Sequence, residues 1–143
     1  MKKFFCIFVV LLFFAIGLAP VYGQAPHLEG SWILEKTELF KKENNTYKPV
    51  DHSDQIISPN NLPFNKLTFD SEQCEGQISD SEKIYGPFRF ENQELELFLR
   101  ALPETFELEW RNSGQMVLSK TFSSVDNSLQ IFDYKIALTY QKR

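Results

Sequence analysis

The residues of this chain best suited to chemistry are two pairs of carboxylates, Glu94 with Glu96 and Glu107 with Glu109. Side chains two residues apart on an extended strand lie on one face about 7 Å apart, a separation that an inverting glycosidase can use. Large apolar residues occupy the alternate positions, so each pair points away from the expected core. We therefore interpret the four carboxylates as a solvated outer surface that keeps the protein soluble and discourages edge pairing.

Histidine and cysteine give little support to a metal site or a nucleophile. His27 and His52 show no ligand spacing to another His, Cys or carboxylate, so we expect no metal ion. Cys74 has no adjacent Lys or His to lower its thiol pKa, and we interpret it as a half-buried strand residue. No nucleophile elbow or glycine-rich phosphate loop is found. The sequence predicts a protein that is not an enzyme and has no cofactor.

The first 23 residues have the pattern of an export signal. Lys2 and Lys3 precede an uncharged apolar run, Phe4 to Ala19, and small residues that a signal peptidase accepts follow it. We expect residues 1–23 to be removed, with an uncleaved anchor as the alternative. Residues 24–143 would then form one exported domain, periplasmic or extracellular, with no stable membrane span.

Charge and cysteine content exclude further classes of partner and of fold. The chain has 15 Lys and Arg against 19 Asp and Glu, a net charge of −4, and loss of Lys2 and Lys3 would lower it to −6. We therefore expect no binding to nucleic acid or to an anionic membrane surface. Removal of Cys6 would leave Cys74 as the one cysteine, so packing must hold the fold without an intramolecular disulfide.

From Ser31 onward, apolar and polar residues alternate with the period of a β-strand, most clearly over Glu94–Leu99 and Thr105–Trp110. Turn residues separate seven or eight such stretches, and Gly86 predicts a bulge in one of them. Residues 41–63 lose the alternation and suggest a long loop or lid. We predict an all-β fold, a single up-and-down antiparallel β-barrel of about eight strands, because closure leaves no exposed edge.

The segment Gly30-Ser31-Trp32 opens the first expected strand soon after the export signal. This start resembles the Gly-x-Trp motif of lipocalins, in particular the short exported lipocalin-like domains of bacteria, which often end in an apolar strand with a basic tail such as Ile136 to Arg143. The resemblance covers residues 24–143 in pattern. It implies that Gly30 and Trp32 close one end of the barrel, with Arg143 or Lys142 as the cation that packs on the tryptophan ring.

Apolar residues that face the interior of such a barrel either fill a core or line a pocket. Eight strands leave an interior just wide enough for either arrangement, so strand number does not decide between them. The residues that would form pocket walls are Leu34, Leu95, Leu97, Phe106, Leu108, Trp110, Met116 and Leu118.

Two functions of different kinds follow. The first is a carrier that binds a small hydrophobic molecule in the barrel, beneath the 41–63 segment. The second is a filled barrel that binds another protein of the cell envelope through its outer face or loops. An exposed apolar patch would indicate the second function, for instance around Ile56, Ile57, Phe98 or Phe132.

Overall fold

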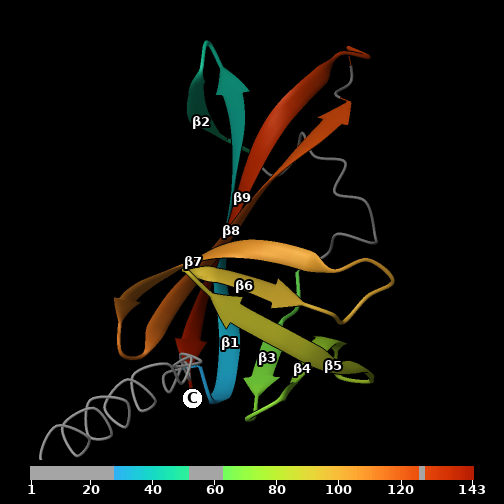
Figure 1. Ribbon diagram of the computed structural model, residues 1–143. Coiled ribbons are helices and arrows are strands. Elements are labelled where there is room, and N and C mark those ends of the chain that lie inside the picture. The colour runs from blue at the N-terminus through green and yellow to red at the C-terminus, as the bar shows by residue number, and fades with distance from the viewer. Residues whose placement is uncertain (1–27, 52–62, 126–127) are drawn as a thin grey trace, which may run out of the picture.

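A computed structural model describes residues 28–51, 63–125 and 128–143, and the regular elements in these ranges are all strands (Figure 1). The strands are β1 (Gly30–Glu43), β2 (Thr46–Val50), β3 (Lys66–Phe69), β4 (Gln73–Ser79), β5 (Glu82–Glu91), β6 (Glu94–Leu97), β7 (Glu104–Asn112), β8 (Gln115–Val125) and β9 (Ile131–Lys142). Within the described ranges there is no helix with the length and apolar character needed to cross a bilayer.

Eight of these strands form a closed barrel. β1 and β3 to β9 pair in chain order, every pair is antiparallel, and β9 returns to pair with β1 over nine residues. β2 is an additional strand that pairs with the far end of β1. The predicted fold class, a single up-and-down antiparallel barrel of about eight strands, is confirmed and is consistent with a lipocalin-like barrel.

The prediction for residues 41–63 is wrong over its first part. Lys41–Glu43 ends β1, and Thr46–Val50 pairs back on it as β2. Asn44 and Asn45 form the two-residue turn with φ of 50° and 63°, a conformation that asparagine tolerates better than most residues. The expected lid falls largely on residues 52–62, which lie outside the described residues.

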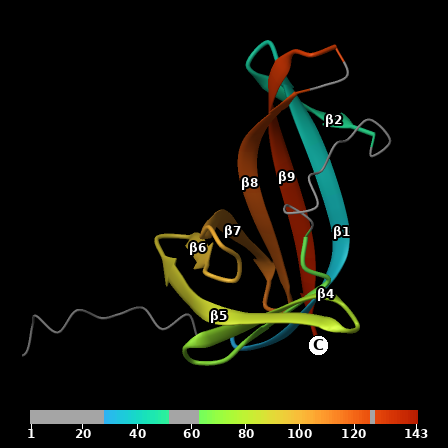
Figure 2. The ribbon, with the colours of Figure 1, turned by 90° about the vertical axis from the view of Figure 1, so that its right-hand side faces the viewer.

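Unequal strand lengths shape the molecule (Figure 2). β3 and β6 have four residues each, whereas β1, β8 and β9 have 14, 11 and 12. β7 pairs with β8 only as far as Ser119, but β8 stays paired with β9 to Val125. The long strands therefore continue beyond the barrel with β2 as a projecting sheet, made of residues 39–43, 46–50, 120–125 and 131–136.

Alternate residues of the barrel strands meet in one core. Those that face inward and are at most 1% exposed are Trp32, Leu67, Cys74, Leu95, Leu97, Met116, Leu118 and Tyr140. Each leucine buried in this way contributes roughly 1.5–3 kcal/mol to stability. The packing agrees with a fold held together without a disulfide.

Candidate functional site

Trp32 pairs with Lys142 near the end of β9, so it lies at the end of the barrel where Figure 2 marks the C-terminus. Its ring is fully buried, and its indole Nε1 donates a 2.7 Å hydrogen bond to the carbonyl oxygen of Leu28. The ring of Trp110 lies against it with centroids 5.7 Å apart, and the ammonium of Lys142 lies 5.3 Å from the ring. These contacts fill the end of the barrel that the Gly-x-Trp start was expected to close.

Lys142, and not Arg143, is the cation over Trp32. The side chain of Arg143 is exposed, and its backbone N–H donates to the carbonyl oxygen of Ser31 at 2.9 Å. Gly30 has φ of +115°, and a Cβ there would lie 3.1 Å from Cε of Lys142. A glycine at this position therefore lets the lysine stem approach and gives the backbone a conformation that other residues rarely adopt.

The residues expected to line a pocket lie in or against the core. Six are buried, namely Leu95, Leu97, Phe106, Leu108, Met116 and Leu118, while Leu34 and Trp110 are half-buried and pack against them. The cavity that borders some of these side chains has a volume of about 10 Å³, which is close to the least that a single water molecule needs. The side chains of the described residues therefore fill the interior at this point.

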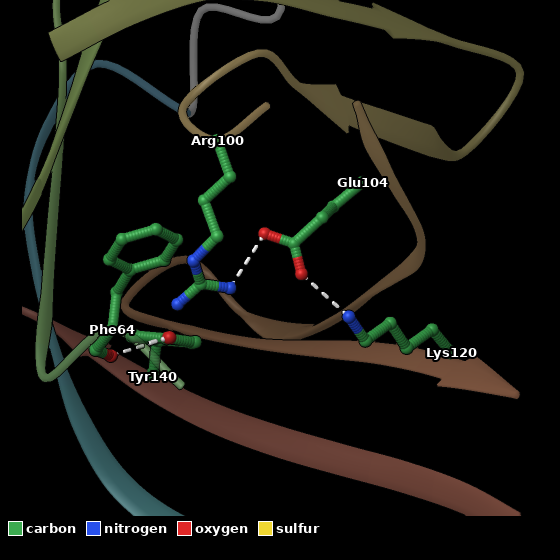
Figure 3. A network of polar contacts seen from close by, with 5 residues as sticks. All are labelled: Phe64, Arg100, Glu104, Lys120 and Tyr140. Atoms are coloured by element: carbon green, nitrogen blue, oxygen red, sulfur yellow. Dashed lines mark hydrogen bonds and ion pairs between the residues drawn. The ribbon is translucent and has the colours of Figure 1, made fainter. Parts of the chain in front are cut away.

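A polar cluster of Arg100, Glu104 and Lys120 lies at the other end of that interior (Figure 3). The Glu104 carboxylate accepts from the Arg100 guanidinium at 2.8 Å and from the Lys120 ammonium at 2.6 Å. The three side chains are only 12–19% exposed. The guanidinium also lies 4.4 Å above the ring of Phe64, whose carbonyl oxygen accepts a 2.7 Å hydrogen bond from the Tyr140 hydroxyl.

This polar cluster joins the segment after β6 to β7 and β8. Ion pairs between well-buried groups depend on both partners being present, because a single charge left there would be poorly solvated. Lys120 follows Met116 and Leu118 at strand spacing, so the alternation alone could have placed its side chain on the inner face. We did not identify any of the three charged residues from the sequence, since charged groups are usually assigned to the outside.

A groove of about 770 Å³ opens beside the polar cluster, and we call it the mouth groove. Its walls come from separate elements: Ile78 of β4, Ile84 of β5, Leu102 of the β6–β7 connection and Phe122 of β8. The polar cluster contributes to the same groove. Its volume falls within the 300–1,000 Å³ usual for small-molecule sites.

The carboxylate pairs, which are the other candidates for chemistry among the described residues, show no catalytic arrangement. Glu94 and Glu107 are direct cross-strand partners on the outer face, and Glu96 forms a 2.7 Å ion pair with Arg89. The outward direction predicted for these carboxylates is confirmed. His27 and His52 lie outside the described residues, and no group of metal-ligating side chains occurs within the described ranges.

Cys74 is more deeply buried than we expected, with 0% of its surface exposed. Burial, with smaller contributions from the nearby carboxylates of Glu75 and Asp70, raises the pKa of its thiol to about 12. A thiol that stays protonated and inaccessible is a poor nucleophile. The residue therefore serves the packing of the core.

The exposed apolar residues lie mainly elsewhere than we expected. Phe98 is 40% exposed, but Phe132 is half-buried with the Lys41 ammonium 3.5 Å from its ring centroid, and Ile56 and Ile57 lie outside the described residues. Leu102 and Tyr85, 77% and 65% exposed, lie in the β6–β7 connection and in β5, but three exposed apolar residues lie together where β8 turns into β9. We call this the hairpin-tip patch; it consists of Val125, Leu129 and Ile131, which are 45%, 86% and 74% exposed.

The fold defines an all-β protein with a closed barrel of eight strands, one additional strand and a filled core. Comparisons of the chain with protein-family models, with curated proteins and with solved structures found no match.

Proposed function

We propose that this protein is a non-catalytic binding module of the cell envelope, in which a filled barrel is the scaffold for a protein-binding surface on its outside. The interior cavity beside Leu97, Phe106 and Leu118 supports this proposal, because a volume of about 10 Å³ is too small for a ligand larger than water. The hairpin-tip patch supplies an apolar surface that stays exposed in the isolated chain. Exposed apolar residues that gather in one place are typical of interaction sites.

Leu129 is the observation that carries the proposal. Its φ is 61°, in the left-handed region that a leucine rarely occupies, and 86% of its surface is exposed. Neither backbone conformation nor burial favours leucine at such a position, where glycine or asparagine would cost less. Val125 and Ile131, which are cross-strand partners, are exposed beside it. Strain of this kind at an exposed residue is often associated with function.

The test introduces a photo-crosslinking amino acid at Leu129 in the producing cells, with Ser113 as an exposed control position in the β7–β8 turn. We expect a covalent adduct with one protein of defined mass from position 129 and none from position 113. The double substitution Val125→Ser with Ile131→Ser should lower the yield of this adduct at least tenfold without changing the midpoint of thermal unfolding. Equal labelling at both positions, or no adduct at 129, contradicts the proposal.

A second candidate keeps the small-molecule carrier but assigns its ligand to the mouth groove. The support is the volume of about 770 Å³, with apolar walls beside the polar cluster, which suits an amphipathic molecule. Native mass spectrometry of the purified protein should then detect a retained ligand that Ile84→Asp removes. Tyr85→Asp is the matched control, because Tyr85 is 65% exposed and alternates with the groove residue Ile84. A wild-type mass equal to that of the chain alone would exclude this candidate.

Export is part of the proposal and rests on residues 1–23, which lie outside the described residues. We expect the mature protein to begin after Gly23. The intact mass of protein isolated from the cell envelope measures this directly. A mass that retains the leader would indicate an anchored form instead.

A further inference from the structure

We propose that β8 binds an extended segment of a partner protein as an added β-strand, along its open edge from Thr121 to Val125. This inference rests on the proposed function and specifies how the partner is bound. Among the described residues this edge is open, because β7 pairs with β8 only as far as Ser119, whereas β9 continues beside β8 on its other side (Figure 2).

The backbone of this edge has hydrogen-bonding groups available. In an antiparallel pair, hydrogen-bonded and non-hydrogen-bonded residue pairs alternate. The 2.8 Å bond from Lys142 N to Gly114 O fixes that alternation for β8 and β9, whose register has no shift. Every second residue beyond the barrel therefore directs its N–H and C=O away from β9: Thr121, Ser123 and Val125. No backbone bond within the described ranges reaches these groups from that side.

The residues of this edge do not discourage strand addition. Natural edge strands are commonly protected by proline or by charged side chains, above all lysine. β2, the other strand at the border of the projecting sheet, carries Lys48 and Pro49. Thr121–Val125 of β8 has neither a proline nor a charge, and its threonine, phenylalanine and valine favour extended structure.

The mouth groove determines which types of side chain the partner's added strand should carry. Phe122 lines this groove, with Ile84 and Leu102 among the other walls. Residues directly opposite one another in a sheet share one face, so the partner residue opposite Phe122 would project into the groove and should be apolar. Its neighbours, opposite Thr121 and Ser123, would face solvent and should be polar. The partner segment is thus an extended peptide with alternating apolar and polar residues and no proline at its centre.

A displayed library of ten-residue linear peptides provides the probe. It is selected on the purified protein, and the recovered peptides are measured on Ser123→Pro and on the matched control Ser123→Ala. Both variants lack the serine hydroxyl, which donates to Asp133 at 2.8 Å, but only the proline variant loses the outward N–H. We expect alternating peptides whose affinity falls at least tenfold for Ser123→Pro and stays within twofold for Ser123→Ala.

A second measurement uses the wild-type protein and so does not depend on the folding of a variant. Amide hydrogen exchange should slow on peptide binding at Thr121, Ser123 and Val125, while Phe122, already bonded to β9, should change little. N-methylation of the peptide amides that face β8 should abolish binding, and N-methylation of the alternate amides should not.

Strand addition is overturned if no peptide is recovered, if peptides bind Ser123→Pro as well as Ser123→Ala, or if protection appears elsewhere. A wild-type dimer that Ser123→Pro dissociates would also overturn it, because the edge would then pair with a second copy. In any of these cases an adduct from Leu129 that persists in Ser123→Pro would leave the proposed protein-binding function standing. If no peptide binds along β8 and no adduct forms from Leu129, both proposals are rejected.

Discussion

The Gly-x-Trp pattern of Gly30 and Trp32 has a physical basis in the contacts that both residues make with Lys142. The +115° φ of Gly30 and its approach to the lysine stem position an ammonium over a buried indole ring. A cation over a tryptophan ring contributes about 0.5–1 kcal/mol when partly exposed. The resemblance to lipocalins implied that the cation is one of two neighbouring residues, Lys142 or Arg143. It did not decide between them, because that depends on the direction of each side chain at the end of β9.

A comparison of Lys142→Met with Arg143→Met tests whether Lys142 supplies the cation over the Trp32 ring. We expect the lysine variant to lose about 0.5–1 kcal/mol of unfolding free energy, since methionine keeps an apolar stem but has no charge. The arginine variant should stay within about 0.5 kcal/mol of wild type because its side chain is exposed. Urea unfolding followed by tryptophan fluorescence measures both. A larger loss for Arg143→Met would assign the cation to Arg143.

The buried thiol of Cys74 makes the free energy of unfolding fall as the pH rises above 9. Its pKa rises from the ordinary value of 9.0 to about 12 on folding, because burial disfavours the thiolate. The folded state therefore holds this proton more tightly than the unfolded state. The stabilising contribution is complete below pH 9 and is lost as the pH rises from 9 to 12, with a slope of up to about 1.4 kcal/mol per pH unit.

We expect Cys74→Ala to flatten the fall of unfolding free energy between pH 9 and 12, compared with wild type. Burial also raises the pKa of Tyr140 above 10.0, so part of the alkaline slope should remain. Urea titrations at half-unit pH steps give the two slopes, each relative to its own value at pH 8. Identical slopes in both proteins would mean that the thiol ionises alike in the folded and unfolded states.

At the scale of elements, alternation predicted where strands lie but not how far they extend. β3 and β4 form a hairpin across Ser71 and Glu72, with the Asp70 carboxylate accepting the backbone N–H groups of Glu72 and Gln73. β2 was missed because Lys48 and Pro49 break the apolar alternation. The signal that could have found it is the asparagine pair before Thr46, which suits the positive φ of a tight turn.

The sequence marked Gly86 as a residue with a special backbone role, but the role that we predicted for it is wrong. We expected a bulge there, but β5 is continuous and the register shift lies between Gln77 and Ser79 of β4. The glycine is needed because a Cβ would lie 2.2 Å from the carbonyl oxygen of Phe98. A long-range approach of this kind leaves no local signal in the sequence.

We expect Gly86→Ala to destabilise the protein by about 3 kcal/mol or more, since backbone must move to admit the methyl group. Gly114→Ala is the control: its Cβ would lie 3.0 Å from Nε2 of Gln141, the flexible end of a side chain, and the change should stay within about 1 kcal/mol. Thermal unfolding of the two variants measures the difference. Equal midpoints of thermal unfolding would contradict this expectation, because the segment after β6 would then move aside at little cost in free energy.

At the scale of the whole molecule, the sequence could not predict whether the barrel is filled. The answer depends on the summed volume of side chains from all its strands, and on charged groups such as Glu104 and Lys120 that reach inward. The eight candidate wall residues lie in or against the core, yet the cavity beside three of them, Leu97, Phe106 and Leu118, is about 10 Å³. Inward direction follows from periodicity, whereas empty space does not.

Leu118→Ala tests whether the interior is filled as tightly as this volume implies. Leu118 is 1% exposed and borders the small cavity, so truncation should enlarge it and cost about 2–5 kcal/mol. Because most side chains that border this cavity are apolar, the enlarged space should favour an apolar guest, and the variant should bind xenon or benzene, which the wild type should not. Leu34→Ala, at a half-buried position on β1, should cost less and create no such site. Binding of benzene by the wild type with similar affinity would show that the barrel opens in solution, and would restore the interior as a place for a small hydrophobic ligand.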